Sequence, residues 1–223
     1  MILLTQNSSQ LTLSCRHLRG ALYRRPWFEN QMSALRPLDF LRTWYNERRR
    51  YYTLDLKGTT DMEIERKFTI KQLPDNLEEY PSLHIEQAYL CTTPVVRVRK
   101  EDNDYILTYK GSGMMAREEH NLALNEEAYY HLRAKADGNI ISKRRYLIPL
   151  VNPTFQEGFP TPPADYELTI ELDVFAPPFA PLVMAEVEFG SREAAEAFVP
   201  PAWFDEDVTY RQEYHNSYLA LRF

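Results

Sequence analysis

Three charged residues share one face of a predicted strand near residue 62. Residues 62–68 read MEIERKF, and side chains alternate between the two faces of a strand. Glu63, Glu65 and Lys67 therefore share one face, and Phe68 lies on the other. The first face has no apolar side chain to bury. Carboxylate oxygens are ligands for hard divalent cations, and an ammonium pairs with phosphate, so this face suits metal-assisted phosphate chemistry.

The same alternation of charged and apolar positions recurs on six later strands. The charged face carries Glu63, Glu65, Lys67, Arg97, Arg99, Lys110, Arg117, Glu119, Lys143, Arg145, Glu171, Asp173, Glu186 and Glu188. The opposite face carries Ile64, Phe68, Val96, Val98, Leu107, Tyr109, Ile141, Ile170, Leu172, Val174, Val187 and Phe189. Any one such strand is explained by a solvated sheet face. The whole set is not, because its signs are sorted into basic and acidic strands, whereas a face made only for solubility intersperses them.

Eight strands are predicted after Met62. They cover residues 62–70, 84–91, 94–102, 104–111, 116–124, 139–150, 166–178 and 182–190. The residues EDND form a hairpin turn between the third and fourth strands. Short connections favour antiparallel pairing, and eight strands are enough to close a barrel.

Three helices are predicted among these strands. The first covers residues 125–138, with Asn125 as N-cap and Gly138 as its stop. The second covers residues 191–200, with Ser191 as N-cap. The third covers residues 209–223, where tyrosines recur every four residues.

A closed barrel with the charged face inward accounts for the sorted charges. The predicted fold is α+β and mostly β, an eight-stranded antiparallel barrel forming a tunnel with a charged lumen, its apolar outer face covered by the helices. Lysine and arginine would bind a small polyanion. The carboxylates would repel that polyanion unless they hold divalent cations that bridge to phosphate. The chemistry that follows is phosphoryl transfer, in which catalysis is mostly positioning and charge stabilisation.

The motifs resemble those of the CYTH superfamily, the triphosphate tunnel metalloenzymes. EIERK resembles the ExExK signature of that family, and RVR, TYK, R-x-E at Arg117 and Glu119, KRRY, ELD and EVEF follow in the same order. The segments ELDVF, AFVPPAWF and LALRF are most similar to small bacterial members that hydrolyse inorganic tripolyphosphate to pyrophosphate and phosphate.

The resemblance implies a role for each charged position. It implies that Mg²⁺ or Mn²⁺ is held by Glu63, Glu65, Asp173, Glu186 and Glu188, with Glu171 as a further member. It implies that triphosphate is bound by Lys67, Arg97, Arg99, Lys110, Arg117, Lys143 and Arg145.

Tyr89 in the QAYL segment matches a tyrosine that, in small bacterial relatives, acts with the ExExK lysine, here Lys67, as general base on the attacking water. The usual pKa of tyrosine is about 10, and surrounding cations are expected to lower it. A tyrosine that hydrogen-bonds phosphate or packs the barrel fits the sequence equally well.

Two positions depart from the family pattern. Asn121 stands where the family often has a second acid, two residues after Glu119, so Glu119 is left out of the expected metal and lysine contacts. Arg144, in the middle of the KRR run, is expected to point outward.

Other functions compete with that of a tripolyphosphatase. A nucleoside or thiamine triphosphatase would need a stacking aromatic at the tunnel mouth, for which Trp203 and Phe204 are candidates, although PPAWF fits a packing loop equally well. An adenylate cyclase would need adenine and ribose contacts. A non-catalytic polyphosphate-binding module would lack the carboxylates. The histidines His84, His120, His131 and His215 show no metal-ligand spacing, and packing or surface roles are expected for them.

The charge balance divides the 223-residue chain in two. Residues 1–61 hold 10 Lys and Arg against 5 Asp and Glu, and residues 62–223 hold 16 against 27. We expect the catalytic domain to be 62–223 and the Arg-rich segment 1–61 to be an extension outside it, with Met62 as the physiological start; an arm for nucleic acid or membrane surfaces is the alternative.

The composition predicts a cytoplasmic protein. No apolar run approaches the ~18 residues of a membrane span, and the first residues lack the basic region of a signal peptide. The two cysteines form no disulfide or zinc pattern. The expected partner is a small polyanion, with neither nucleic acid nor membrane.

Overall fold

The computed structural model describes residues 61–162 and 166–222. The Arg-rich extension and the proposed start at Met62 therefore remain predictions, because residues 1–60 lie outside the described part.

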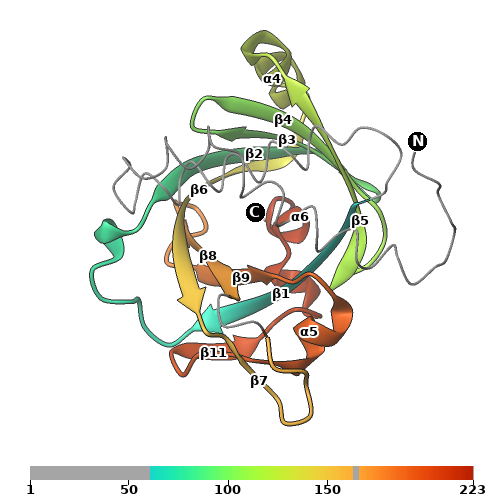
Figure 1. Cartoon of the computed structure of the whole chain (residues 1–223). Helices are drawn as coiled ribbons and strands as arrows, with labels where there is room; N and C mark the ends of the chain where they lie inside the picture. Colours follow the sequence, from blue (N-terminus) through green and yellow to red (C-terminus); the bar gives the residue numbers. More distant parts are fainter. Residues whose placement is uncertain (1–60, 163–165, 223) are drawn as a thin grey trace, which may run out of the picture. The chain divides into compact units, whose positions relative to one another are not determined.

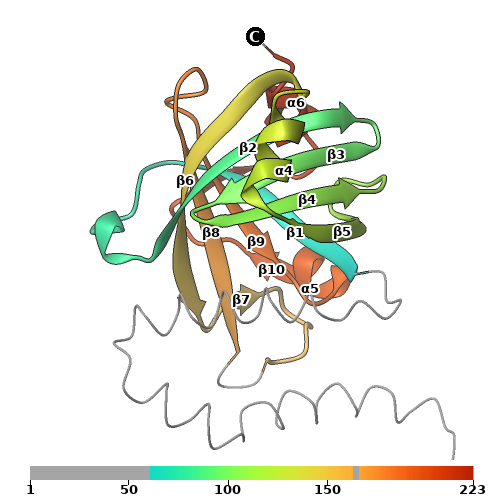
Figure 2. The ribbon, with the colours of Figure 1, turned by 90° about the horizontal axis from the view of Figure 1, so that it is seen from above.

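Eight antiparallel strands form a closed barrel, seen along its axis in Figure 1 and from the side in Figure 2. They are β1 (Asp61–Ile70), β2 (Ser82–Thr92), β3 (Val95–Glu101), β4 (Asp104–Lys110), β5 (Ala116–Leu124), β6 (Asp137–Val151), β8 (Glu167–Phe175) and β9 (Val183–Glu188). Their order is β1-β5-β4-β3-β2-β6-β8-β9, and pairing of β9 with β1 closes the ring. The predicted eight strands and the predicted barrel are confirmed.

Short elements that the sequence did not predict surround the barrel. Strand β11 (Phe204–Asp207) extends the sheet beside β1, and β7 (Thr154–Phe155) pairs with β10 (Phe198–Val199). A 3₁₀ turn, η1 (Leu77–Glu79), precedes β2. Elements of two to four residues are too short to show a period, so no pattern in the sequence could indicate them.

The main apolar core lies outside the barrel, as the sequence predicted. Outward-facing residues of β1, β6, β8 and β9 pack under α5 (Arg192–Ala197), β10 and β11. The ring of Phe68 lies 4.8 Å from that of Phe204 and 6.2 Å from that of Phe198, measured between centroids. Ser191 caps α5 as predicted, because its side chain accepts a hydrogen bond from Ala194 N at 3.1 Å.

Helix α4 (Glu126–Arg133) covers the outer face of β2, β3 and β4. Asn125 is its N-cap as predicted, accepting from Ala128 N at 2.7 Å. Gly138 is not its stop: the helix ends at Arg133, and Gly138 lies in β6 with φ 70°. The last turn is closed earlier by hydrogen bonds within residues 132–136, so no glycine is needed to end it.

The predicted helix over 209–223 is wrong. This segment holds only the 3₁₀ turn η2 (Gln212–Tyr214) and the short helix α6 (Asn216–Leu219) in its described part. Tyr210 and Tyr218 are exposed, so the tyrosines make no buried helical face. The position of this segment is set by tertiary contacts and not by a long helix. Helix α6 lies inside the ring of strands in Figure 1 and at one end of the barrel in Figure 2.

The lumen is apolar at the end where α6 lies. Leu219 and Ala220 pack there with Tyr89, Ile141, Phe175, Phe179 and Met184. Helix α6 therefore packs against lumen-facing residues, whereas the predicted third helix was expected to cover the outer face. Ile141, expected on the outer face, lies two residues before Lys143 and shares its face; it is fully buried in this cluster.

Candidate active site

The strand register turns the predicted charged positions into the lumen. Directly paired residues of antiparallel strands share a face. Glu63 pairs with Arg117, Lys110 with Glu119, Lys67 with Glu186, and Arg145 with Asp173. The remaining predicted site residues fall on the same face by the same registers: Glu65, Tyr89, Arg97, Arg99, Lys143, Glu171 and Glu188.

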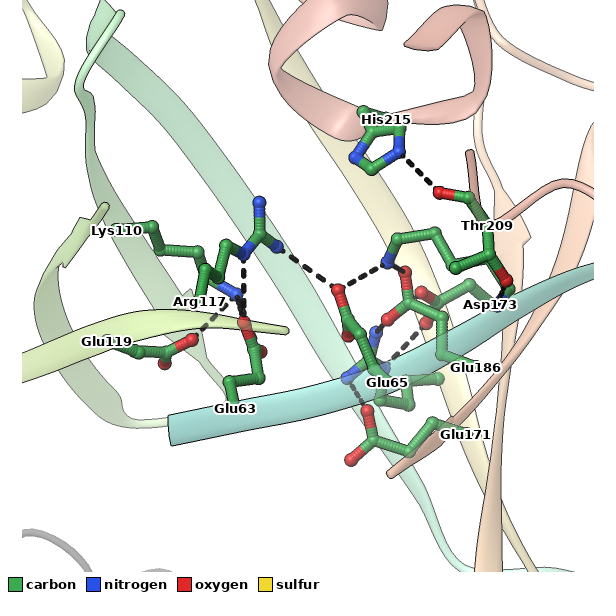
Figure 3. Close-up of polar contacts among 12 residues, drawn as sticks. Glu63, Glu65, Lys110, Arg117, Glu119, Glu171, Asp173, Glu186, Thr209 and His215 are labelled. Carbon is green, nitrogen blue, oxygen red and sulfur yellow. Dashed lines mark hydrogen bonds and ion pairs between the residues drawn. The ribbon is translucent and has the colours of Figure 1, made fainter. Parts of the chain in front are cut away.

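One group of ion pairs spans β1, β4 and β5 (Figure 3). Lys110 Nζ lies 2.6 Å from both carboxylate oxygens of Glu63 and 2.6 Å from Glu119 Oε2. Arg117 bridges the two ExExK acids, with Nε 3.1 Å from Glu63 Oε2 and Nη2 3.1 Å from Glu65 Oε1. The two acids of the motif are thus held by bases from neighbouring strands.

Glu119, which was left out of the expected lysine contacts, does contact a lysine. Glu119 lies in the lumen, contacts Lys110, and accepts a hydrogen bond from Asn121 Nδ2 at 2.6 Å. Asn121 in turn accepts from Thr108 Oγ1 at 2.6 Å. An amide at 121 therefore orients Glu119 toward Lys110, and a second acid is not required for that contact.

A second group spans β1, β6, β8 and β9. Lys67 Nζ lies 2.5 Å from Glu186 Oε1 and 2.9 Å from Glu65 Oε1. Arg145 binds Asp173 through Nε at 2.7 Å and Nη2 at 2.6 Å, and binds Glu186 through Nη2 at 2.6 Å. Arg145 also pairs with Glu171, and Lys143 with Asp173. Glu65 joins this group to the first one, because it contacts both Lys67 and Arg117.

Burial and neighbouring charge act in opposite directions on the acids. Burial, with the adjacent Glu65 and Glu119 carboxylates, raises the pKa of Glu63. Burial also acts to raise the pKa of Glu65, but Lys67, Lys110 and Arg117 outweigh it and hold the pKa at about 2. Glu65 is therefore ionised at neutral pH, while like charges crowd around Glu63.

Lys143 shows the opposite balance. Burial, together with the like charge of Arg145, lowers the pKa of Lys143 to about 8. These two effects outweigh the pairing of Lys143 with Asp173. The ammonium of Lys143 is therefore costly to keep charged in the lumen.

Arg97 has a buried donor that nothing in the described chain satisfies. Its Nε is buried and has no hydrogen-bond acceptor among residues 61–162 and 166–222. Buried polar groups of native proteins are nearly always paired, and a guanidinium N–H needs an oxygen acceptor. An anionic ligand in the lumen would supply one.

Tyr89 lies in the lumen but in an apolar setting. Its hydroxyl accepts from Gln87 Nε2 at 3.1 Å, and Tyr89 is 2% exposed. Burial raises the pKa of Tyr89, although Arg97, Arg117 and Lys67 act to lower it. The expectation that the cations would lower the pKa below its usual value is therefore wrong, because desolvation is the larger effect.

Glu188, Arg99 and Arg144 lie on the faces predicted for them. Glu188 faces the lumen opposite Glu65 and is exposed. Arg99 Nε lies 2.9 Å from Glu101 Oε1, an acid that sequence reasoning did not single out. Arg144 is exposed and points outward to Ser82, as predicted.

Trp203 and Phe204 do not line the lumen. Their rings lie 4.5 Å apart, and both belong to the outer core around Phe68. The candidate stacking aromatics are therefore packing residues.

His215, which was expected to serve only packing or surface roles, lies beside the lumen charges. It is buried, its Nε2 contacts Thr209 O at 3.1 Å, and the charges of Lys67, Arg117 and Glu65 act on it. No spacing in the sequence could have indicated this, because residues 209–215 reach the site through a loop and not through a periodic element.

Comparisons with known proteins identify the family of this chain. Residues 61–176 match the model of the CYTH domain. This chain belongs to the CYTH domain family. A curated relative from Nitrosomonas europaea, named inorganic triphosphatase, is 37% identical over 163 residues, which are 71% of this chain and 97% of the relative.

Solved structures of CYTH relatives share the fold. The crystal structure of the inorganic triphosphatase NE1496 aligns with a TM-score of 0.52 at 32% identity, over 74% of this chain and 99% of that one. A second structure, described as the hypothetical protein NE1496, aligns with a TM-score of 0.51 at 34% identity, over 71% and 97% of the two chains. Among the described residues, no helix is long and apolar enough to cross a membrane.

Proposed function

We propose that this CYTH protein hydrolyses inorganic tripolyphosphate to pyrophosphate and phosphate inside the lumen, with the help of a divalent cation. The observation that carries the proposal is the buried basic wall: Lys67, Arg97, Arg99, Lys110, Lys143 and Arg145 are each at most 7% exposed and face one another across the barrel. Carboxylates accompany most of these cations, but the buried Nε of Arg97 has no acceptor in the described chain, and an anionic substrate would supply one. The name of the Nitrosomonas europaea relative supports the same substrate.

Substrate binding would change the partners of the basic residues. Lys110, Arg117 and Arg145 each contact two or more carboxylates. Guanidinium groups bind phosphate oxygens as well as carboxylates, often through two parallel hydrogen bonds. A triphosphate in the lumen would take over some of these donors and would meet the unsatisfied Nε of Arg97.

The carboxylates fit a hard cation by chemistry. Among the described residues, no group of three or more His, Cys, Asp and Glu side chains is already arranged to hold a metal ion. The donor set nevertheless consists of carboxylate oxygens. Burial, and then the neighbouring Glu65 and Glu119 carboxylates, raise the pKa of Glu63, and a divalent cation would offset these effects. The residues that would hold it are Glu63, Glu65, Glu171, Asp173, Glu186 and Glu188. Mg²⁺ or Mn²⁺ bound there would neutralise charge on the phosphate oxygens.

Lys67 is placed to act during the chemical step. It is buried, and contacts with Glu186 and Glu65 raise its pKa, so it is cationic at neutral pH. A fixed positive charge stabilises the charge that develops as the phosphoryl group is transferred. Tyr89, with its raised pKa, is better suited to hydrogen-bond the substrate beside Arg97 than to take a proton from water.

The substrate is tested by measuring phosphate release from tripolyphosphate, ATP and thiamine triphosphate, each with Mg²⁺ or Mn²⁺ and with EDTA as control. The proposal expects the highest kcat/KM for tripolyphosphate and no activity in EDTA. A preference for ATP or thiamine triphosphate would indicate a nucleoside or thiamine triphosphatase. Formation of cyclic AMP from ATP would indicate an adenylate cyclase. Assay in the soluble fraction of the source cells would test the cytoplasmic location.

A further inference from the structure

The C-terminal segment brings a histidine to the lumen in a defined orientation. His215 is 8% exposed, and its Nε2 lies 3.1 Å from the carbonyl oxygen of Thr209. A carbonyl oxygen only accepts, so Nε2 carries the proton. In the neutral ring, Nδ1 then keeps a lone pair. Nδ1 is turned away from Thr209, to the side where the guanidinium of Arg117 ends (Figure 3), and no residue of the described chain hydrogen-bonds to it.

Two hydrogen bonds tie this segment to the strand that carries Lys67. The backbone N–H of Lys67 donates to Thr209 Oγ1 at 3.1 Å, and Val208 N donates to Lys67 O at 2.9 Å. His215 is therefore linked through Thr209 to the backbone of the ExExK lysine. A ring held in this way has little freedom to turn away from the site.

Burial and the neighbouring positive charges favour the neutral imidazole of His215. Burial, then the positive charges of Lys67 and Arg117, lower the pKa of His215, and these effects outweigh the Thr209 hydrogen bond and the Glu65 carboxylate. A neutral imidazole can accept a proton at pH 7, whereas the phenol of Tyr89, whose pKa is raised, is almost fully protonated there.

We propose that Nδ1 of His215 is the general base for the attacking water, an inference that rests on the proposed hydrolysis of triphosphate. The water oxygen forms a bond to the terminal phosphorus, and the bridging P–O bond of the anhydride breaks. One water proton passes to Nδ1, and pyrophosphate departs with the bonding electron pair. Lys67 stabilises the charge on the reacting phosphoryl group in the same step.

The test compares His215→Gln, His215→Ala and wild type on tripolyphosphate. The amide of glutamine can still donate to Thr209 O, yet it provides no basic nitrogen. General-base catalysis contributes about 10²–10⁴-fold, so His215→Gln should lower kcat by about 100-fold or more while KM stays within about threefold. Added imidazole should restore part of the kcat of His215→Ala. His120→Gln is the matched control, because His120 is an exposed histidine paired with Glu118 on β5, and its kcat should equal that of wild type.

The outcomes separate this inference from the proposed function. Phosphate release by the wild-type protein tests the proposed function. The ratio of variant to wild-type kcat on the best substrate tests whether His215 is the general base. A kcat for His215→Gln within threefold of wild type would overturn the inference. So would a higher KM with kcat retained, or a loss of kcat in His215→Ala that imidazole does not restore, because either result indicates a structural role.

Discussion

At the scale of single residues, the site is a set of buried acids and bases that satisfy one another. Most of the basic residues have a carboxylate partner in the lumen, and the Nε of Arg97 stands out because it has no acceptor in the described chain. A buried pair of ions is neutral or unfavourable for stability unless its geometry is excellent. The cost of assembling these charges is therefore best explained by function.

Replacing Arg97 with alanine should lower kcat/KM for tripolyphosphate at least tenfold. Losing a charge-assisted hydrogen bond to a buried group costs about 1.5–3 kcal/mol, and about 1.4 kcal/mol corresponds to a factor of ten. Arg144→Ala is the control, since Arg144 lies on the outer face of the barrel and should leave kcat/KM unchanged. Equal kinetics for both variants would remove Arg97 from the substrate contacts.

Substitutions of Lys67 and Glu65 should lower activity for different reasons. Lys67→Ala should lower kcat by about 100-fold, because its charge acts as the transition state forms. Glu65→Gln should instead raise the Mn²⁺ concentration for half-maximal activity about tenfold or more. Calorimetric Mn²⁺ titration beside steady-state kinetics separates the two effects. Loss of Mn²⁺ binding in Lys67→Ala with kcat retained at saturating metal would contradict this division.

At the scale of elements, the segment after β11 connects the outer core to strand β1, which carries Lys67. Arg66, on the outer face of β1, binds Asp207 of β11 through Nε at 3.0 Å and Nη2 at 2.5 Å. Asp207 accepts from Thr209 N at 2.9 Å, and Thr209 contacts both Lys67 and His215. The placement of α6 therefore depends on contacts far from it in the sequence.

Asp207 should stabilise the fold in a pH-dependent way. Burial acts to raise the pKa of Asp207, but hydrogen bonds from Thr209 and the pairing with Arg66 outweigh it and lower the pKa. A carboxyl group with a lowered native pKa contributes stability above its unfolded pKa of about 3.9, and that stability is lost as pH falls through the native pKa. Urea unfolding between pH 7 and pH 2 should show a smaller acid loss for Asp207→Asn than for wild type. Parallel curves for the two proteins would exclude the contribution.

Gly138 should be required for the docking of the C-terminal segment. It has φ 70°, and a Cβ there would lie 2.2 Å from Ala220 O. Gly158 is a matched control, because it has φ 90° but a Cβ added there would have nothing within 4 Å. Both alanine variants incur backbone strain, on the order of 1–2 kcal/mol. Gly138→Ala should lose more stability than Gly158→Ala, as measured by thermal unfolding, and should also have a lower kcat. Equal loss in both variants would show that the contact with Ala220 is unimportant.

At the scale of the whole molecule, the barrel and its charged lumen could be predicted because strand alternation is local. The strand order and the registers that bring Glu63 to Arg117 and Lys67 to Glu186 were not predicted, because β1 pairs with β5 and β9, which are far from it in the sequence. The contribution of residues 209–222 could not be predicted, since His215 reaches the lumen through tertiary hydrogen bonds that leave no period in the sequence.

The same limit explains the error at Tyr89. The sequence indicates which charges surround a side chain, but the degree of burial depends on packing. Here the apolar end of the lumen, formed with Leu219 and Ala220, desolvates the phenol more strongly than Arg97 and Lys67 stabilise its anion.

The buried basic lumen of this CYTH protein should hydrolyse tripolyphosphate at its terminal anhydride. The most direct measurement is ³¹P NMR of tripolyphosphate incubated with the purified chain and Mg²⁺ or Mn²⁺. We predict that the tripolyphosphate signals disappear while pyrophosphate and phosphate appear in equal amounts, and that Lys67→Ala slows this about 100-fold. Unchanged tripolyphosphate in the presence of either metal, with enzyme that remains folded, would show that tripolyphosphate is not its substrate.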